Sequence, residues 1–210
     1  PAAFAAPPPG ALRDYLKLRA RLSIARSVVV QPTAYGADNS CTLAAIEAMG
    51  ASARGVAMVT GDETDGELER LALGGMQAFK FRALPGGVLA WEKLDRMAAR
   101  AQELGWFTDI EMDGRTLPEH EAQIGRLPGT LMIDHIGKFL EPVSLDHPGV
   151  AVLMRLVAGG RTYVKIASPY DSSRSGPPDY ADMAPLVAAL ARAAPDRLVW
   201  ASNWPHAALA

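Results

Sequence analysis

Cysteine is nearly absent from this sequence, since Cys41 is the only one in 210 residues. A single cysteine can form neither a disulfide within the chain nor a zinc site built from several cysteines. Positive charge is not in excess either, because 21 lysines and arginines face 23 aspartates and glutamates. The sequence therefore predicts no nucleic-acid partner, and its lack of cysteine pairs makes the cytoplasm the expected location.

Long apolar runs are missing as well. No run approaches the roughly 20 residues that a transmembrane helix needs, so we expect no membrane contact. The opening stretch PAAFAAPPPG lacks the basic start and the apolar middle of a signal peptide, and is typical of an extended loop. Apolar residues nevertheless make up 49% of the chain, which is enough for one sizeable core. We expect a single domain over residues 1–210.

Short apolar runs alternate with helical patterns along the chain. The predicted strands are RSVVVQ, RGVAMV, MQAFKF, WFTDIEM, TLMIDH, TYVKIA and RLVWAS. Helical patterns cover residues 11–22, 38–49, 65–73, 91–104, 148–158 and 180–193. Alternation of this kind predicts an α/β fold with a parallel sheet.

The spacing of the strands favours a barrel. Strands begin about 25 residues apart, which is typical of the βα units of an eight-stranded (β/α)8 TIM barrel. A helical pattern precedes the first predicted strand, and almost nothing follows the seventh. We therefore expect a barrel whose first strand lies upstream of Pro1 and whose last helix lies beyond Ala210, so that the sequence is a fragment. A doubly wound open sheet is the alternative, although no glycine-rich phosphate loop follows any strand.

Polar side chains gather at the carboxyl ends of the predicted strands, where barrel enzymes carry their active sites. They are Gln31, Lys80, Arg82, Asp109, Glu111, Asp134, His135, Lys165, Asn203 and His206. Lys80 and Arg82 alternate with phenylalanines, so both point to one side of the sheet, where burial requires an anionic partner. We favour a bound ligand as that partner over a structural ion pair with Glu111 or Asp109, either of which could also serve as a general base.

The four histidines divide into two groups. His135 ends the strand LMIDH just before Gly137, and we expect a functional role at the strand tip. His206 follows a proline after the last strand, where it has either a functional role or a role in the loop. His120 and His147 fall in helical or loop stretches away from the strand ends, and we expect them at the surface.

Several motifs occur together in a fixed order: VVVQPTAYGADNSCTL, LPGG, LMIDHIGKF, YVKIASPYDSSR and PDRLVWASNWPH. Through them the sequence, from about residue 27 to residue 206, resembles the amidohydrolase-related barrels that act on lactones of dicarboxylic acids. It is most similar to the galactarolactone isomerases, above all at NWPH, and is also similar to the 2-pyrone-4,6-dicarboxylate lactonases. The resemblance implies a TIM-barrel enzyme that acts on a lactone.

One residue departs from the pattern of this superfamily. Metal-dependent members bind divalent metal through a His-x-His pair on the first strand, and an aspartate on the last strand takes a proton from metal-bound water. Here that position holds Asn203, and an amide is not basic near neutral pH. The departure is expected if a hydroxyl of the substrate attacks the lactone carbonyl instead of water, since a held intramolecular nucleophile has an effective molarity of about 10⁵ M or more.

The resemblance thus implies an isomerase that converts the δ-lactone of a sugar dicarboxylic acid to the γ-lactone, with no metal or other cofactor. A lactone hydrolase is the alternative. It would use a divalent metal such as zinc if the upstream His-x-His pair is present, and Asn203 would be an engineered replacement or would be compensated by a base such as Glu111. A relative that kept the anion pocket but lost the chemistry is the third reading.

Each candidate residue has an expected role. His135, rather than His206, takes the proton from the attacking hydroxyl and delivers it to the leaving ring oxygen, while Asn203 stabilises the oxyanion. Ser173 is expected to add a hydroxyl contact to the substrate. The predicted substrate-binding residues are Gln31, Lys80, Arg82, Glu111, Lys138, Lys165, Tyr170, Ser172 and Arg174. The ligand is a small carboxylated lactone, no metal ligand is assigned, and no oligomeric state is predicted.

Overall fold

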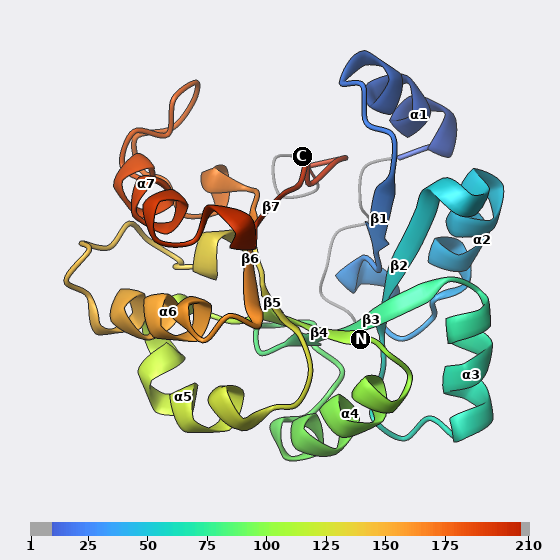
Figure 1. Cartoon of the computed structure of the whole chain (residues 1–210). Helices are drawn as coiled ribbons and strands as arrows, with labels where there is room; N and C mark the ends of the chain where they lie inside the picture. The colour runs from blue at the N-terminus through green and yellow to red at the C-terminus, as the bar shows by residue number, and fades with distance from the viewer. Residues whose placement is uncertain (1–9, 207–210) are drawn as a thin grey trace.

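The computed structural model describes residues 10–206, which form a curled parallel sheet with helices around its outside (Figure 1). The strands are β1 (Ser27–Val30), β2 (Ala53–Met58), β3 (Met76–Arg82), β4 (Phe107–Glu111), β5 (Leu131–Ile133), β6 (Thr162–Ile166) and β7 (Leu198–Trp200). They lie in sequence order, and each strand pairs in parallel with the next. Their carboxyl ends therefore meet at one edge of the sheet.

Helices connect consecutive strands on the outside of the curl. They are α1 (Leu12–Arg21), α2 (Ser40–Met49), α3 (Asp65–Leu73), α4 (Trp91–Glu103), α5 (Leu117–Arg126), α6 (Pro148–Ala158) and α7 (Ala184–Ala193). Helix α3 begins with a capping box, in which the side chains of Thr64 and Glu67 each bond the backbone N–H of the other residue. None of the helices in residues 10–206 has the length and apolarity that crossing a membrane requires.

The period of two along a strand separates the apolar core from the charged face. On β3, Phe79 and Phe81 are fully buried, and Phe81 packs edge-on against Trp91 of α4 with ring centroids 4.5 Å apart. Because successive side chains of a strand point to opposite faces, Lys80 and Arg82 point away from the helices. The outer face of the sheet is thus the core beneath the helices, and the opposite face carries the charges.

The predicted α/β fold with its seven strands is confirmed. The doubly wound alternative is wrong, because the strand order runs from β1 to β7 without the reversal that such a sheet requires. The eighth strand upstream of Pro1 and the helix beyond Ala210 stay predictions, because both concern residues outside 10–206.

Some predicted boundaries and positions need correction. Helix α7 begins at Ala184 rather than at residue 180, and helix α5 was not predicted, because few of its residues are apolar. His120 and His147 are half-buried rather than at the surface. His120 stacks on Trp91 at 4.0 Å between ring centroids, and His147 accepts a hydrogen bond from the backbone of α6 at its start.

Candidate active site

Buried charges of opposite sign alternate across the carboxyl edge of β3 to β6. Lys80 Nζ lies 2.7 Å from Glu111 Oε2 and 2.8 Å from Asp134 Oδ2. Lys165 Nζ lies 2.7 Å from Asp134 Oδ1 and 3.1 Å from Asp109 Oδ2. Strands β3, β4 and β6 and the residue that follows β5 supply these groups. Each cation therefore meets two carboxylates, which compensates the cost of burying it.

A second layer of charges lies outside this network. Arg82 forms an ion pair with Glu111, and Lys138 forms one with Asp171. Lys138 Nζ also lies 3.6 Å from Glu111 Oε1, so Glu111 is shared among Lys80, Arg82 and Lys138. The ion pairs of Lys80 and Arg82 with Glu111 are therefore present, whereas the ligand contacts that we favoured stay predictions.

The network separates the pKa values of its acids. Burial, together with the nearby charge of Asp134, raises the pKa of Asp109 to about 6. Burial alone would raise the pKa values of Glu111 and Asp134 as well, but Lys80 and the other nearby cations lower both below their ordinary range. Asp109 is therefore the carboxyl group in this network that takes up a proton most easily, whereas Glu111 and Asp134 stay ionised at neutral pH.

His135 faces the same carboxylates from a strained turn. Its Nε2 lies 3.6 Å from Asp134 Oδ2 and 3.7 Å from Glu111 Oε1, while its buried Nδ1 has no hydrogen-bond partner among residues 10–206. Burial lowers its pKa, so the ring is neutral at neutral pH. A neutral imidazole has one nitrogen with a free lone pair, which is what a general base needs.

A second polar group lies at the tips that follow β6 and β7. Asn203 Nδ2 donates a hydrogen bond of 2.7 Å to Tyr170 Oη, which lies 3.3 Å from His206 Nδ1. Tyr170 precedes Asp171 in a short 3₁₀ turn, so the ion pair of Asp171 with Lys138 joins this group to the charged network. Asp171 was not predicted as a site residue, although the motif YDSSR that contains it pointed to this loop.

Two predicted substrate-binding residues at the far side of that loop have other partners. The side chain of Arg174 is 75% exposed and pairs with Glu141. Ser173 Oγ donates to a carboxylate oxygen of Asp182 at 2.5 Å. Both side chains thus hold the loop together, and neither contacts the charged network.

Two other predicted substrate-binding residues are buried with their polar groups occupied. The amide of Gln31 donates to the backbone carbonyls of Gly36 and Asp38 and accepts from Thr42. The hydroxyl of Ser172 donates to the carbonyl of Phe139. These contacts secure the loops after β1 and β6, so a substrate contact at either residue would require one of these bonds to break.

Glu111, Asp134 and His135 form a group of metal-type ligands, the atoms of which lie within 4.8 Å of one another. The ammonium of Lys80 already lies between the two carboxylates, at 2.7 and 2.8 Å. A divalent ion placed there would share these oxygens with a buried positive charge. The side chains as arranged therefore do not fit a metal ion.

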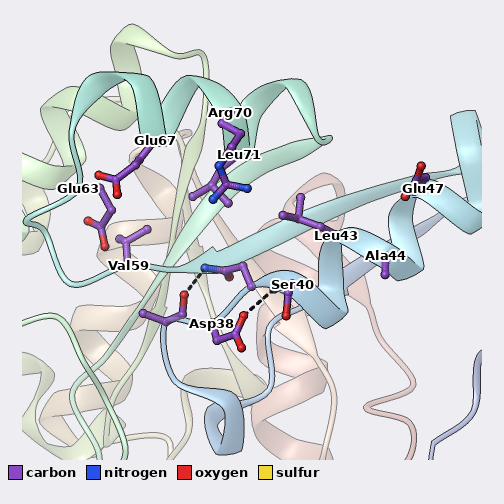
Figure 2. A pocket seen from close by; sticks show the side chains of 12 residues that line it. Asp38, Ser40, Leu43, Ala44, Glu47, Val59, Glu63, Glu67, Arg70 and Leu71 are labelled. Carbon is purple, nitrogen blue, oxygen red and sulfur yellow. Dashed lines mark hydrogen bonds between the residues drawn. The ribbon is translucent and has the colours of Figure 1, made fainter.

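A hollow of about 480 Å³ lies elsewhere, between α2 and α3 (Figure 2). Its lining includes Asp38, Ser40, Glu63, Glu67 and Arg70, and no residue of the two polar groups above. The carboxylates of Glu63 and Glu67 accept hydrogen bonds from nearby backbone N–H groups, so they stabilise the loop and the start of α3. The hollow is therefore separate from the predicted site.

Comparison with known proteins confirms the resemblance that the motifs indicated. The chain is 35% identical to D-galactarolactone isomerase of Agrobacterium fabrum over 202 residues, which cover 95% of this chain and 69% of the relative. It is 32% identical to 4-sulfomuconolactone hydrolase of Rhizobium radiobacter (95% and 68% covered). It is 31% identical to 2-pyrone-4,6-dicarboxylate hydrolase of Comamonas testosteroni (90% and 65% covered).

A solved structure matches the fold closely. It is an apo crystal structure from Agrobacterium tumefaciens, with a TM-score of 0.92 and 33% sequence identity over 99% of this chain and 76% of that one. The family model described as "Amidohydrolase" matches residues 1–210. The chain belongs to the amidohydrolase family.

Proposed function

We propose that this protein isomerises an aldarolactone, converting the δ-lactone of a sugar dicarboxylic acid into the γ-lactone without a metal ion. The observation that carries the proposal is the place of Lys80, whose ammonium neutralises the carboxylates of Glu111 and Asp134. The similarity to D-galactarolactone isomerase and the amide at Asn203 support the same reading. The substrate class is small carboxylated lactones, and the cytoplasm remains the expected location.

The chemistry requires no water. A hydroxyl of the substrate attacks the lactone carbonyl, and its proton passes to the neutral ring of His135. One N–H of Asn203 donates to the negative oxygen of the tetrahedral intermediate. When the original ring C–O bond breaks, His135 returns the proton to the departing ring oxygen. One C–O bond forms and one breaks, so atoms and charge balance.

The outer cations suit the carboxylate of such a substrate. The side chains of Arg82 and Lys138 are more exposed than that of Lys80, and all three already pair with carboxylates of the protein. Arginine also has the planar fork that binds a carboxylate through two hydrogen bonds. We therefore assign substrate binding first to Arg82 and Lys138, and a mainly electrostatic role to Lys80, while Lys165, as exposed as Lys138, stays a predicted substrate-binding residue.

Hydrolysis of a carboxylated lactone is the alternative function. The similarity to 4-sulfomuconolactone hydrolase and 2-pyrone-4,6-dicarboxylate hydrolase favours it. In that case a carboxylate such as Glu111 would have to activate water in place of the usual aspartate. The pKa of Glu111 is lowered below its ordinary range, against the effect of burial, mainly by Lys80, and this makes Glu111 a weak base.

An assay with purified full-length protein separates the two functions. Galactaro-δ-lactone is supplied in the presence of EDTA, and the products are followed by ¹³C NMR. We expect the γ-lactone to appear faster than the free dicarboxylate, at a rate that added Zn²⁺ does not raise.

The variant Asn203→Asp sharpens the assay, with the exposed Gln77→Glu as an amide-to-acid control. A negative charge beside the developing oxyanion should slow ring exchange by about 100-fold or more, as the loss of an oxyanion donor does elsewhere, whereas Gln77→Glu should match the unaltered protein. If Asn203→Asp with Zn²⁺ instead hydrolyses 2-pyrone-4,6-dicarboxylate strongly, the isomerase proposal is wrong.

A further inference from the structure

Tyr170 lies where the polar side chains of the β6 and β7 tips meet. Its Oη accepts a hydrogen bond from Asn203 Nδ2 at 2.7 Å and one from Ser168 Oγ at 3.4 Å. His206 Nδ1 lies 3.3 Å from the same oxygen. A single hydroxyl group thus contacts both side chains that follow β7 and were predicted to be catalytic.

The number of hydrogen bonds that a phenol can donate and accept determines which group donates in the contact between Tyr170 and His206. A tyrosine hydroxyl has one proton to donate and can accept at its oxygen lone pairs. Asn203 and Ser168 both donate to this oxygen, so the proton of Tyr170 is available to His206 Nδ1. A neutral histidine that accepts at Nδ1 carries its own proton on Nε2.

The fold holds Tyr170 in this place from both sides. Asp171, the next residue, forms an ion pair with Lys138, and Ser172 donates to the carbonyl of Phe139. Before it, Ser168 adopts a left-handed backbone conformation with φ of 53°, which a serine seldom does. Such strain persists only where the surrounding contacts impose it.

We propose that Tyr170 is a positioning residue, which fixes His206 in the tautomer protonated on Nε2 and orients the amide of Asn203. His206 then serves as a hydrogen-bond donor beside Asn203, and His135 is left as the group that carries the proton. The inference rests on the proposed function for its catalytic meaning, but the tautomer of His206 is a property of the free protein.

Tyr170 was predicted to bind substrate directly, and the two roles have different consequences. A hydroxyl that only binds substrate affects KM, and it leaves the ring of His206 unchanged when no substrate is present. A hydroxyl that positions His206 and Asn203 affects kcat, and its loss changes the tautomer in the free protein.

The test is ¹⁵N NMR of the histidine rings in the substrate-free, full-length protein, with the signals of His206 assigned by their loss in His206→Gln. In the unaltered protein we expect Nε2 of His206 to be protonated and Nδ1 to have the shift of a hydrogen-bond acceptor. In Tyr170→Phe we expect both tautomers to appear. The control Tyr163→Phe removes the hydroxyl of a tyrosine on β6, which contacts Arg197 and not this group.

Kinetics give the second readout. Tyr170→Phe should lower kcat for the lactone about 10- to 100-fold, by analogy with the cost of losing a group that orients a metal ligand, with KM little changed. A proton on Nδ1 of His206 in the unaltered protein, or ring shifts that Tyr170→Phe leaves unchanged, would overturn the inference. The NMR result needs no turnover, so it stands even if the proposed reaction is wrong.

Discussion

Lys80 and Asp109 are buried charged residues on neighbouring strands, and they differ in how fully the surrounding groups compensate their charge. Lys80 contacts two carboxylates, and the charges of Asp134 and Glu111 raise its pKa against the effect of burial. Asp109 has Lys165 as its ion-pair partner, and one of its oxygens has no hydrogen bond within residues 10–206. Breaking a buried ion pair costs about 3 to 5 kcal/mol, so Lys80 holds the β3, β4 and β5 tips together as well as shaping the chemistry.

Asp109 should make stability depend on pH in the weakly acidic range. Its pKa rises from 3.8 to about 6 on folding, so the folded state binds a proton that the unfolded state releases between these values. Its contribution to stability therefore becomes less favourable as pH rises from about 3.8 to about 6, by up to the order of 3 kcal/mol. We expect the free energy of unfolding in urea, compared with that of Asp109→Asn, to fall between about pH 4 and about pH 6 and to level off above about pH 7.

The exposed Asp146→Asn is the control for this measurement, and its pH curve should run parallel to that of the unaltered protein. If the curve of Asp109→Asn is parallel as well, Asp109 does not titrate in this range.

The turn after β5 determines where the side chain of His135 points. His135, Ile136 and Lys138 all have positive φ, between 49° and 58°, and Gly137 between them has φ of 85°. Left-handed backbone costs non-glycine residues roughly 1–2 kcal/mol each, so packing must hold this turn. Ile136 and Phe139 are buried beside it, and a Cβ on Gly137 would lie only 2.8 Å from a ring carbon of Phe139.

Gly137→Ala should therefore disturb the site more than an equivalent change elsewhere. Gly160 has a similar φ of 80°, but a Cβ there would meet no atom within 4 Å. Both variants should lose roughly 1–2 kcal/mol of stability from the backbone strain, and Gly137→Ala should lose a further 1 to 3 kcal/mol or so from crowding against Phe139. Urea unfolding and kcat check this, since Gly137→Ala alone should also lower kcat; equal effects of the two variants would show that the turn is not held by Phe139.

Elements of the fold were predictable where apolar residues recur with a clear period. β3 was predicted because Phe79 and Phe81 alternate with charges, and the same alternation indicated that Lys80 and Arg82 share a face. Helix α5 was missed because few of its residues, LPEHEAQIGR, are apolar.

Details of the site depend on loops, where sequence periods end. Strand alternation indicates which face a cation points to, but not that Lys80 pairs with Asp134 or Lys138 with Asp171. The direct contacts of Tyr170 with Asn203 and His206 likewise depend on the path of two separate loops, so no local pattern predicts them.

The predicted site combines residues from distant parts of the chain. Because every strand is parallel to its neighbours, the tips of β3 to β7 converge at one edge of the curled sheet (Figure 1). The first helix takes part as well, since Tyr15 of α1 packs against Trp204 beside Asn203, with ring centroids 5.4 Å apart. Order at the catalytic tip therefore depends on packing between the two ends of residues 10–206.

The most direct test of metal-free ring exchange is isotope transfer from H₂¹⁸O, measured by mass spectrometry on galactaro-δ-lactone incubated with the full-length protein and EDTA. Because a hydroxyl of the substrate is the nucleophile, we predict that the γ-lactone forms with no ¹⁸O above that of a protein-free sample. A γ-lactone that carries ¹⁸O from the solvent would mean that water opens the ring first, which would contradict the account.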